Sequence, residues 1–107
     1  MHIEVLHIEG CPSWKETGTR TRRALDVLGF ADVEVHYRLI ASPVEAQSTQ
    51  FGGSPTVLVD GKDAFGSTER VGDLSCRLYP TPEGLRDSPT LPQLIEAVRA
   101  HSATRVS

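Results

Sequence analysis

The alternation of apolar and polar residues predicts four short strands. A nearly continuous apolar run at 3–8 is typical of a central strand covered on both faces. The strict alternation at 33–39 is typical of a strand with one face toward solvent, near the sheet edge. The apolar run 56–59 leads into Asp60-Gly61, the strongest two-residue hairpin signal. We therefore expect a β-hairpin whose returning strand lies at 62–65.

Three further segments carry helix signals. Apolar and small residues recur every three or four positions across 12–28, and Gly29 is placed to end this helix. Segment 42–53 opens with an N-cap serine, a proline and a glutamate, and closes with two glycines, which predicts a short helix. Segment 90–101 combines a capping box with one apolar stripe, which predicts the last helix.

These elements follow the order βαβαββα, so we expect one α/β domain over residues 1–101. Its four strands should form a mixed sheet with helices on both faces. A long irregular loop is expected at 66–89, before the last helix, and loops of that length usually have a function. The polar segment 102–107 is expected to be a disordered tail.

Charge and composition narrow the classes of function. The 107 residues carry a formal net charge of −3 with no run of like charge, so a nucleic-acid-binding surface is not expected. No apolar stretch approaches the roughly 18 residues of a membrane span, and residues 1–6 lack the features of a secretion signal. We therefore expect no membrane association and a cytoplasmic location. Three clustered arginines form either a solvated helix face or an anion or partner site: Arg20, Arg22 and Arg23.

Cys11 is the candidate reactive group. It lies between the first strand and the first helix, where unpaired backbone N–H groups and the helix dipole favour a thiolate. Lowering a thiol pKa from about 8.5 to about 6.5 would raise the thiolate fraction at pH 7 from roughly 3% to roughly three quarters. The alternative is an inert, buried cysteine that acts as a small apolar residue.

Two motifs, together with the element order, carry a family resemblance. Gly10-Cys11-Pro12 precedes the first helix, and Gly53-Ser54-Pro55-Thr56 opens the third strand. The chain thereby resembles the thioredoxin superfamily over residues 1–66 and 90–101. The resemblance implies a thioredoxin-like fold and a cis Ser54–Pro55 bond that faces Cys11. The expected substrate contacts are Pro12, Trp14, Ser54 and Pro55.

A narrower resemblance rests on the Gly10–Trp14 motif and the segments 53–61 and 74–79. It is to small bacterial thioredoxin-like proteins, some of which are labelled alkylmercury lyase. In a C-x-x-C motif position 14 would hold the resolving cysteine, but this chain has Trp14 there. Trp14 itself is either a core residue or a lid over the thiol that contacts ligand.

Cys76 is therefore the only candidate partner thiol. In the expected topology the loop after the hairpin starts at the Cys11 pole, so Cys76 is within reach of Cys11. Its alternative role is that of a buried packing thiol. We expect Leu74, Leu78 and Tyr79 to pin the loop over the Cys11 pole, and in a reducing compartment both cysteines should be thiols.

The histidines and Glu9 add little chemistry. The four histidines lie on different elements without metal-ligand spacing, so neither a metal nor a cofactor is expected. His7 lies near the Cys11 pole, either as a hydrogen-bonded core residue or as a base. Glu9 adjoins the site, where a solvated charge is the simpler interpretation.

Three hypotheses of function follow. The first is a thiol-based redox protein in which Cys11 attacks a protein or small-molecule disulfide, a peroxide or an electrophile. Cys76 or an external thiol then resolves the mixed species. The second is organomercury or soft-metal handling by the two thiolates. The third is a redox-inert binding module built on the same fold.

Overall fold

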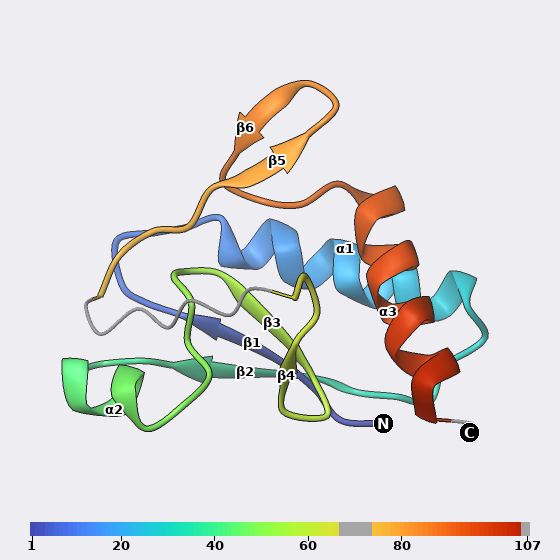
Figure 1. Ribbon diagram of the computed structural model, residues 1–107, viewed down its shortest axis with the longest axis horizontal. Helices are drawn as coiled ribbons and strands as arrows, with labels where there is room; N and C mark the ends of the chain where they lie inside the picture. Colours follow the sequence, from blue (N-terminus) through green and yellow to red (C-terminus); the bar gives the residue numbers. More distant parts are fainter. Residues whose placement is uncertain (67–73, 106–107) are drawn as a thin grey trace.

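The computed structural model describes residues 1–66 and 74–105 and has a four-stranded mixed sheet at its centre (Figure 1). The sheet order is β2-β1-β3-β4, where β1 is parallel to β2 and antiparallel to β3, and β3 is antiparallel to β4. The predicted α/β class and the edge position of the second strand are confirmed. The strands are β1 (Ile3–His7), β2 (Val35–Leu39), β3 (Thr56–Val59) and β4 (Lys62–Asp63).

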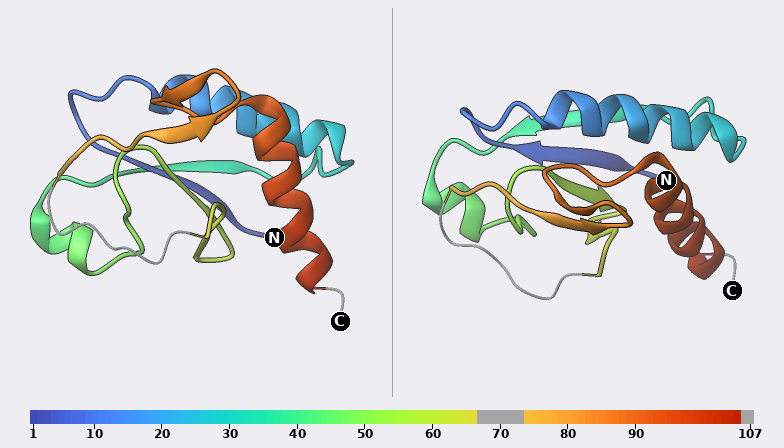
Figure 2. Two further views of the ribbon diagram at one scale, coloured as in Figure 1. Left: turned by 45° about the horizontal axis from the view of Figure 1, so that its top comes forward. Right: turned by 90° about the horizontal axis from the view of Figure 1, so that it is seen from above.

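Helices lie on both faces of the sheet (Figure 2), and on each face they contribute side chains to an apolar cluster. The helices are α1 (Trp14–Val27), α2 (Pro43–Gln47) and α3 (Leu91–Arg105). Side chains of α1 and α3 pack with Ile3, Val57 and Val59 in one buried cluster. Leu6 and Leu58 point to the opposite face, because side chains alternate along a strand, and pack there with Ala46 of α2. Cys11 belongs to this second cluster.

Local signals in the sequence account for the hairpin and two helix starts. Asp60 and Gly61 both have positive φ, at 52° and 82°, as a tight hairpin turn between β3 and β4 requires. The Ser42 hydroxyl accepts a hydrogen bond from the Glu45 N–H at 3.2 Å, which caps α2. The capping box before α3 also forms. The Gln93 backbone N–H donates to the Thr90 hydroxyl at 3.2 Å, and the Thr90 backbone N–H donates to the Gln93 side-chain oxygen Oε1 at 2.9 Å.

Three helix boundaries differ from the predicted ones. The second helix ends at Gln47, before the two glycines that were expected to end it. The first helix begins at Trp14 instead of position 12, because the preceding turn closes with a tighter bond from the Lys15 N–H to the Pro12 carbonyl. The last helix continues past His101 to Arg105, so residues 102–105 are helical and the disordered tail expected there is wrong. Positions 106–107 of that predicted tail lie outside the described residues.

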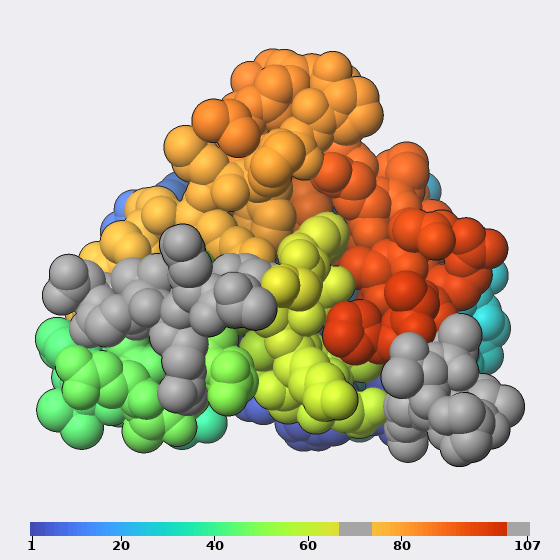
Figure 3. Space-filling model, in the orientation of Figure 1, coloured from blue at the N-terminus to red at the C-terminus, as the bar shows by residue number. Residues whose placement is uncertain are grey.

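The loop expected to be irregular contains a second, two-stranded sheet. Strands β5 (Tyr79–Thr81) and β6 (Gly84–Arg86) form an antiparallel hairpin that projects from the body of the molecule (Figure 3). Gly84 has a φ of 101°, and the Thr81 hydroxyl bonds across the turn, so local turn chemistry formed a hairpin that the apolar pattern did not signal. Part of the predicted loop, 67–73, lies outside the described residues.

The clustered arginines are mostly used to hold loops. Arg20 donates to the Pro89 carbonyl at 2.8 Å, and Arg22 donates to carbonyls of the α1–β2 loop. Only Arg23 is a simple exposed residue of the three. Two of the three guanidinium groups are therefore not simply solvated, while the binding of an anion or partner by the cluster stays a prediction. In the described parts of the chain, no helix is long and apolar enough to cross a membrane.

Candidate functional site

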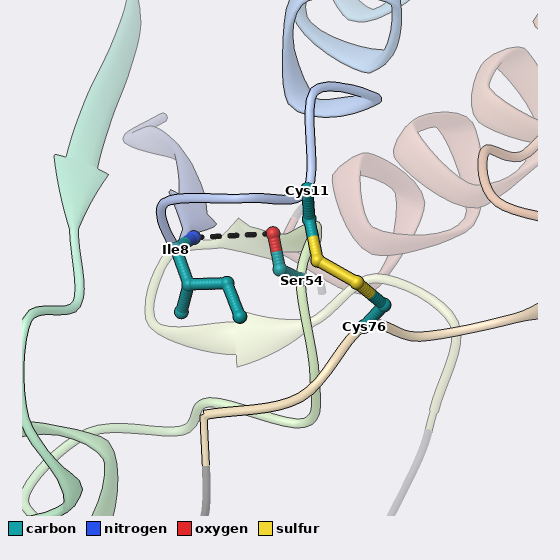
Figure 4. Close-up of a disulfide and its surroundings, with 4 residues drawn as sticks. All are labelled: Ile8, Cys11, Ser54 and Cys76. Atoms are coloured by element: carbon teal, nitrogen blue, oxygen red, sulfur yellow. Dashed lines mark hydrogen bonds between the residues drawn. A yellow bond between two sulfur atoms is a disulfide. The ribbon is translucent and has the colours of Figure 1, made fainter.

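Cys11 and Cys76 form a disulfide (Figure 4). Their Cα atoms are 6.2 Å apart, within the range that a disulfide allows. The expected proximity of Cys76 to the Cys11 pole is therefore confirmed. The interpretation of Cys76 as a buried packing thiol is wrong, because Cys76 is exposed. Neither cysteine is a free thiol in this structure, in contrast to the expectation for a reducing compartment.

Cys11 lies at the end of a turn that leaves the central strand. Gly10, with a φ of 87°, reverses the chain after β1 and places Cys11 three positions before α1. Cys11 is only 5% exposed and packs with apolar side chains that include Ile40 and Phe51. The first N–H groups of α1 have no acceptor within the helix and lie just beyond Cys11 in the chain.

Backbone pairing with Ser54 holds the segment that carries Cys76. The Ser54 N–H donates to the Ser75 carbonyl, and the Arg77 N–H donates to the Ser54 carbonyl, both at 2.8 Å. These bonds form a short parallel bridge opposite Cys76. The backbones approach so closely that a Cβ on Gly53, where φ is 105°, would lie 2.7 Å from the Arg77 Cβ. Glycine at position 53 is therefore required by both conformation and space.

An ion pair anchors the same segment to β4. The Arg77 guanidinium donates to both carboxylate oxygens of Asp63, at 2.7 and 3.4 Å, and the two side chains are 12% and 7% exposed. The guanidinium also lies 4.6 Å from the ring centroid of Tyr79. This two-point geometry fixes the direction of the chain just after Cys76.

Tyr79 supplies the apolar part of the anchor. It is buried, and its hydroxyl donates to the Pro55 carbonyl. Burial raises the pKa of Tyr79, so the phenol stays protonated and can donate. Leu74 and Leu78 were expected to pin the loop as well, but they are 39% and 59% exposed. Sequence reasoning missed Arg77 and Asp63, because two charged residues far apart in the chain carry no periodic signal.

The residues of the expected substrate contacts divide into two groups. Ser54 and Pro55 are buried, the bond between them is cis as the resemblance implies, and the Ser54 hydroxyl accepts from the Ile8 N–H at 3.2 Å (Figure 4). Both residues contact the segment that carries Cys76, Ser54 through its backbone and Pro55 through its carbonyl bond with Tyr79, and their contact with substrate stays a prediction. Pro12 and Trp14 border an open pocket of about 550 Å³ beside Cys11.

Trp14 forms a wall of this pocket. It is half-buried, stacks on His7 with ring centroids 4.2 Å apart, and meets Tyr37 edge-on at 5.5 Å. Trp14 is therefore more than a core residue, while a contact with ligand stays a prediction. Leu39, which is 42% exposed, also borders the pocket and contributes apolar surface.

His7 departs from the expected hydrogen-bonded core histidine. Its Nδ1 is buried and has no hydrogen-bond partner among the residues that the structure describes. Burial lowers the pKa of His7, so the ring is neutral at pH 7. Exposed Glu9 and Lys15 place one charge of each sign around the same pocket.

Comparisons with protein-family models, with curated proteins and with solved structures find no match to this chain. Among residues 1–66 and 74–105, no group of three or more histidine, cysteine, aspartate or glutamate side chains could hold a metal ion. The two cysteines at this pole are joined in the disulfide described above.

Proposed function

We propose that this chain is a thioredoxin-like thiol–disulfide exchange protein that alternates between a Cys11–Cys76 disulfide and two thiols. The observation that carries the proposal is the disulfide itself, which joins a buried cysteine before α1 to an exposed cysteine on a separate, anchored segment. A purely structural disulfide would not need one exposed cysteine, Cys76, joined to a cysteine that borders an open pocket, Cys11.

The arrangement of the sheet supports the thioredoxin-like part of the proposal. The order β2-β1-β3-β4, with only β1 and β2 parallel, agrees with what the resemblance implies. Gly10-Cys11-Pro12 leads from β1 toward α1, and Ser54-Pro55 leads into β3 beside it. Both motifs therefore lie at one pole of the domain.

The exchange reaction involves two electrons. Two external thiolates reduce the protein disulfide: the first forms a mixed disulfide and releases one protein thiolate, and the second breaks the mixed disulfide and releases the other. The two external thiolates leave as one disulfide. The protein gains their two electrons and, after it takes up protons, has two thiols. The partners are protein or small-molecule thiols and disulfides, as in a cytoplasm that contains glutathione.

A redox titration tests the proposal. The protein is equilibrated in glutathione buffers between about −350 and −150 mV, and its free thiols are labelled and counted by mass spectrometry. We expect a single reversible two-electron transition, with two thiols appearing together. Cys76→Ser is the matched control, because it should show one thiol, or its mixed disulfide with glutathione, and no intramolecular pair. A protein that stays fully oxidised or fully reduced across this range would contradict the proposal.

The same geometry favours one second candidate, soft-metal handling. The Cα atoms of Cys11 and Cys76 are 6.2 Å apart, so their reduced thiol groups could bind a thiophilic ion between them. The test adds one equivalent of mercuric ion to reduced protein and measures retention through gel filtration in competing thiol. Retention that requires both cysteines, together with no redox transition, would favour this function over exchange.

A further inference from the structure

We infer that external sulfur always bonds to the same cysteine, Cys76, and that Cys11 is the internal leaving and resolving group. This inference rests on the proposed function and assigns a role to each sulfur. It reverses the expectation from the sequence, in which Cys11 attacks the substrate.

The first observation is the unequal exposure of the two cysteines. Cys11 is 5% exposed and packs with Leu6, Ile8 and Phe51, whereas Cys76 is exposed. An incoming thiolate must approach a disulfide sulfur along the S–S axis, on the side away from the other sulfur. Cys11 belongs to a packed cluster, although it also borders the pocket, so little room is open to a thiolate that approaches it. Cys76 is an exposed residue and offers the more open approach.

The second observation is the surroundings of each sulfur as a leaving group. A thiolate at Cys11 would lie before the first turn of α1, whose N–H groups lack intrahelical acceptors and favour negative charge. Nearby Glu9 and Lys15 carry opposite charges, so the helix start provides the net bias. Next to Cys76 the guanidinium of Arg77 is already paired with Asp63. The helix start therefore favours Cys11 as the leaving thiolate, while burial of Cys11 in the apolar cluster opposes it, so the difference in exposure carries more of the assignment.

The third observation is how each cysteine is held in the structure. Cys11 is covered by the core, while Cys76 lies on a segment whose neighbours Leu74 and Leu78 are exposed. Anchors on both sides, the Ser54 bridge and the Arg77–Asp63 pair, keep Cys76 close to Cys11. A mixed disulfide on Cys76 can therefore extend into solvent and still be reached by Cys11.

In the oxidation cycle, a substrate disulfide accepts two electrons from the two protein thiols. A substrate disulfide R–S–S–R′ is attacked by the Cys76 thiolate, which forms Cys76–S–S–R and releases R′S⁻. The Cys11 thiolate then attacks the Cys76 sulfur, forms the Cys11–Cys76 bond and releases RS⁻. The substrate gains two electrons and the protein loses two, and the protons of the two cysteine thiols pass to the two released thiolates through solvent. Two external thiolates run the cycle backward, the first one attacking Cys76.

Competitive labelling of the wild-type protein tests the assignment. Fully reduced protein is treated with one tenth of an equivalent of N-ethylmaleimide, and the label on each cysteine is counted by peptide mapping. We expect at least about tenfold more label on Cys76 than on Cys11 in the folded protein, because the burial of Cys11 outweighs the effect of the helix start on its thiolate. Labelling should be about equal in concentrated urea, where neither cysteine is buried. Equal labelling in the folded protein, or an excess on Cys11, would overturn the assignment.

Two single variants test the disulfide step. After treatment with oxidised glutathione, Cys11→Ser should form a stable mixed disulfide on Cys76 at least about tenfold faster than Cys76→Ser forms one on Cys11. The reverse order would overturn the assignment while leaving the proposed function intact. A wild-type protein without a redox transition would instead overturn the proposed function. If the serine at position 11 prevents folding, the labelling ratio in the wild-type protein decides.

Discussion

Reduction of the Cys11–Cys76 disulfide should lower the free energy of unfolding by about 4 kcal/mol. The two cysteines are separated by 65 positions, so the disulfide closes most of the chain into one loop. In the unfolded chain, closing a loop of this length removes entropy worth about 4 kcal/mol at 25 °C. Stabilities of domains this size are only about 5–15 kcal/mol, so the change is a large fraction of the total.

Urea unfolding with and without reductant measures this difference. Trp14 is the single tryptophan and reports on the pole that carries the disulfide. With a slope of about 2 kcal/mol per molar urea, the midpoint should fall by about 2 M on reduction. Cys76→Ser is the matched control, because Cys76 is exposed and serine is similar in size. It should unfold where the reduced wild type does, with no response to reductant.

A midpoint shift below about 0.5 M would refute this reasoning, because it corresponds to about 1 kcal/mol. Such a result would mean that the unfolded chain is already restricted, or that the two cysteines are not joined in the folded protein. Labelling of free thiols before and after reduction distinguishes these cases.

Three further predictions concern the surroundings of the disulfide. Asp63→Asn should lower the free energy of unfolding in urea by about 3 kcal/mol, because it leaves the largely buried Arg77 guanidinium without a counterion. An effect below about 1 kcal/mol would show that this ion pair does not anchor the segment that carries Cys76. Burial lowers the pKa of His7 below 6.5, so the unfolded chain binds the His7 proton more readily than the folded protein does, and the free energy of unfolding should fall as the pH drops below 6.5. His7→Phe should weaken this fall. A urea midpoint with the same pH dependence in both proteins would contradict the lowered pKa of His7. Gly18→Ala should stabilise a Tyr37→Ala background by up to about 1 kcal/mol through helix propensity, and should stabilise the wild type less. In the wild type the new Cβ would lie 2.5 Å from Cε1 at the end of the exposed Tyr37 side chain, which must shift. Thermal unfolding of the four variants measures this difference, and equal effects in the two backgrounds would contradict it.

The sequence alone predicted the features that depend on neighbouring residues. The Asp60-Gly61 turn and the caps of α2 and α3 formed because each is decided within a few positions of the chain. The placement of Cys11 between a strand and a helix could be predicted for the same reason. The start of α1 and the β5–β6 hairpin could not, because they depend on turn geometry that the apolar pattern does not record.

Only the tertiary structure decided how Cys76 meets Cys11. The contacts that hold Cys76 join distant positions: Arg77 to Asp63, the backbone of Ser54 to the segment around Cys76, and Tyr79 to the carbonyl of Pro55. None of these pairs has a periodic or local signal, because each depends on where separate segments pack. The same packing buries Cys11 and leaves Cys76 exposed. This difference in exposure, which no motif encodes, decides which of the two cysteines we propose to bond with external sulfur.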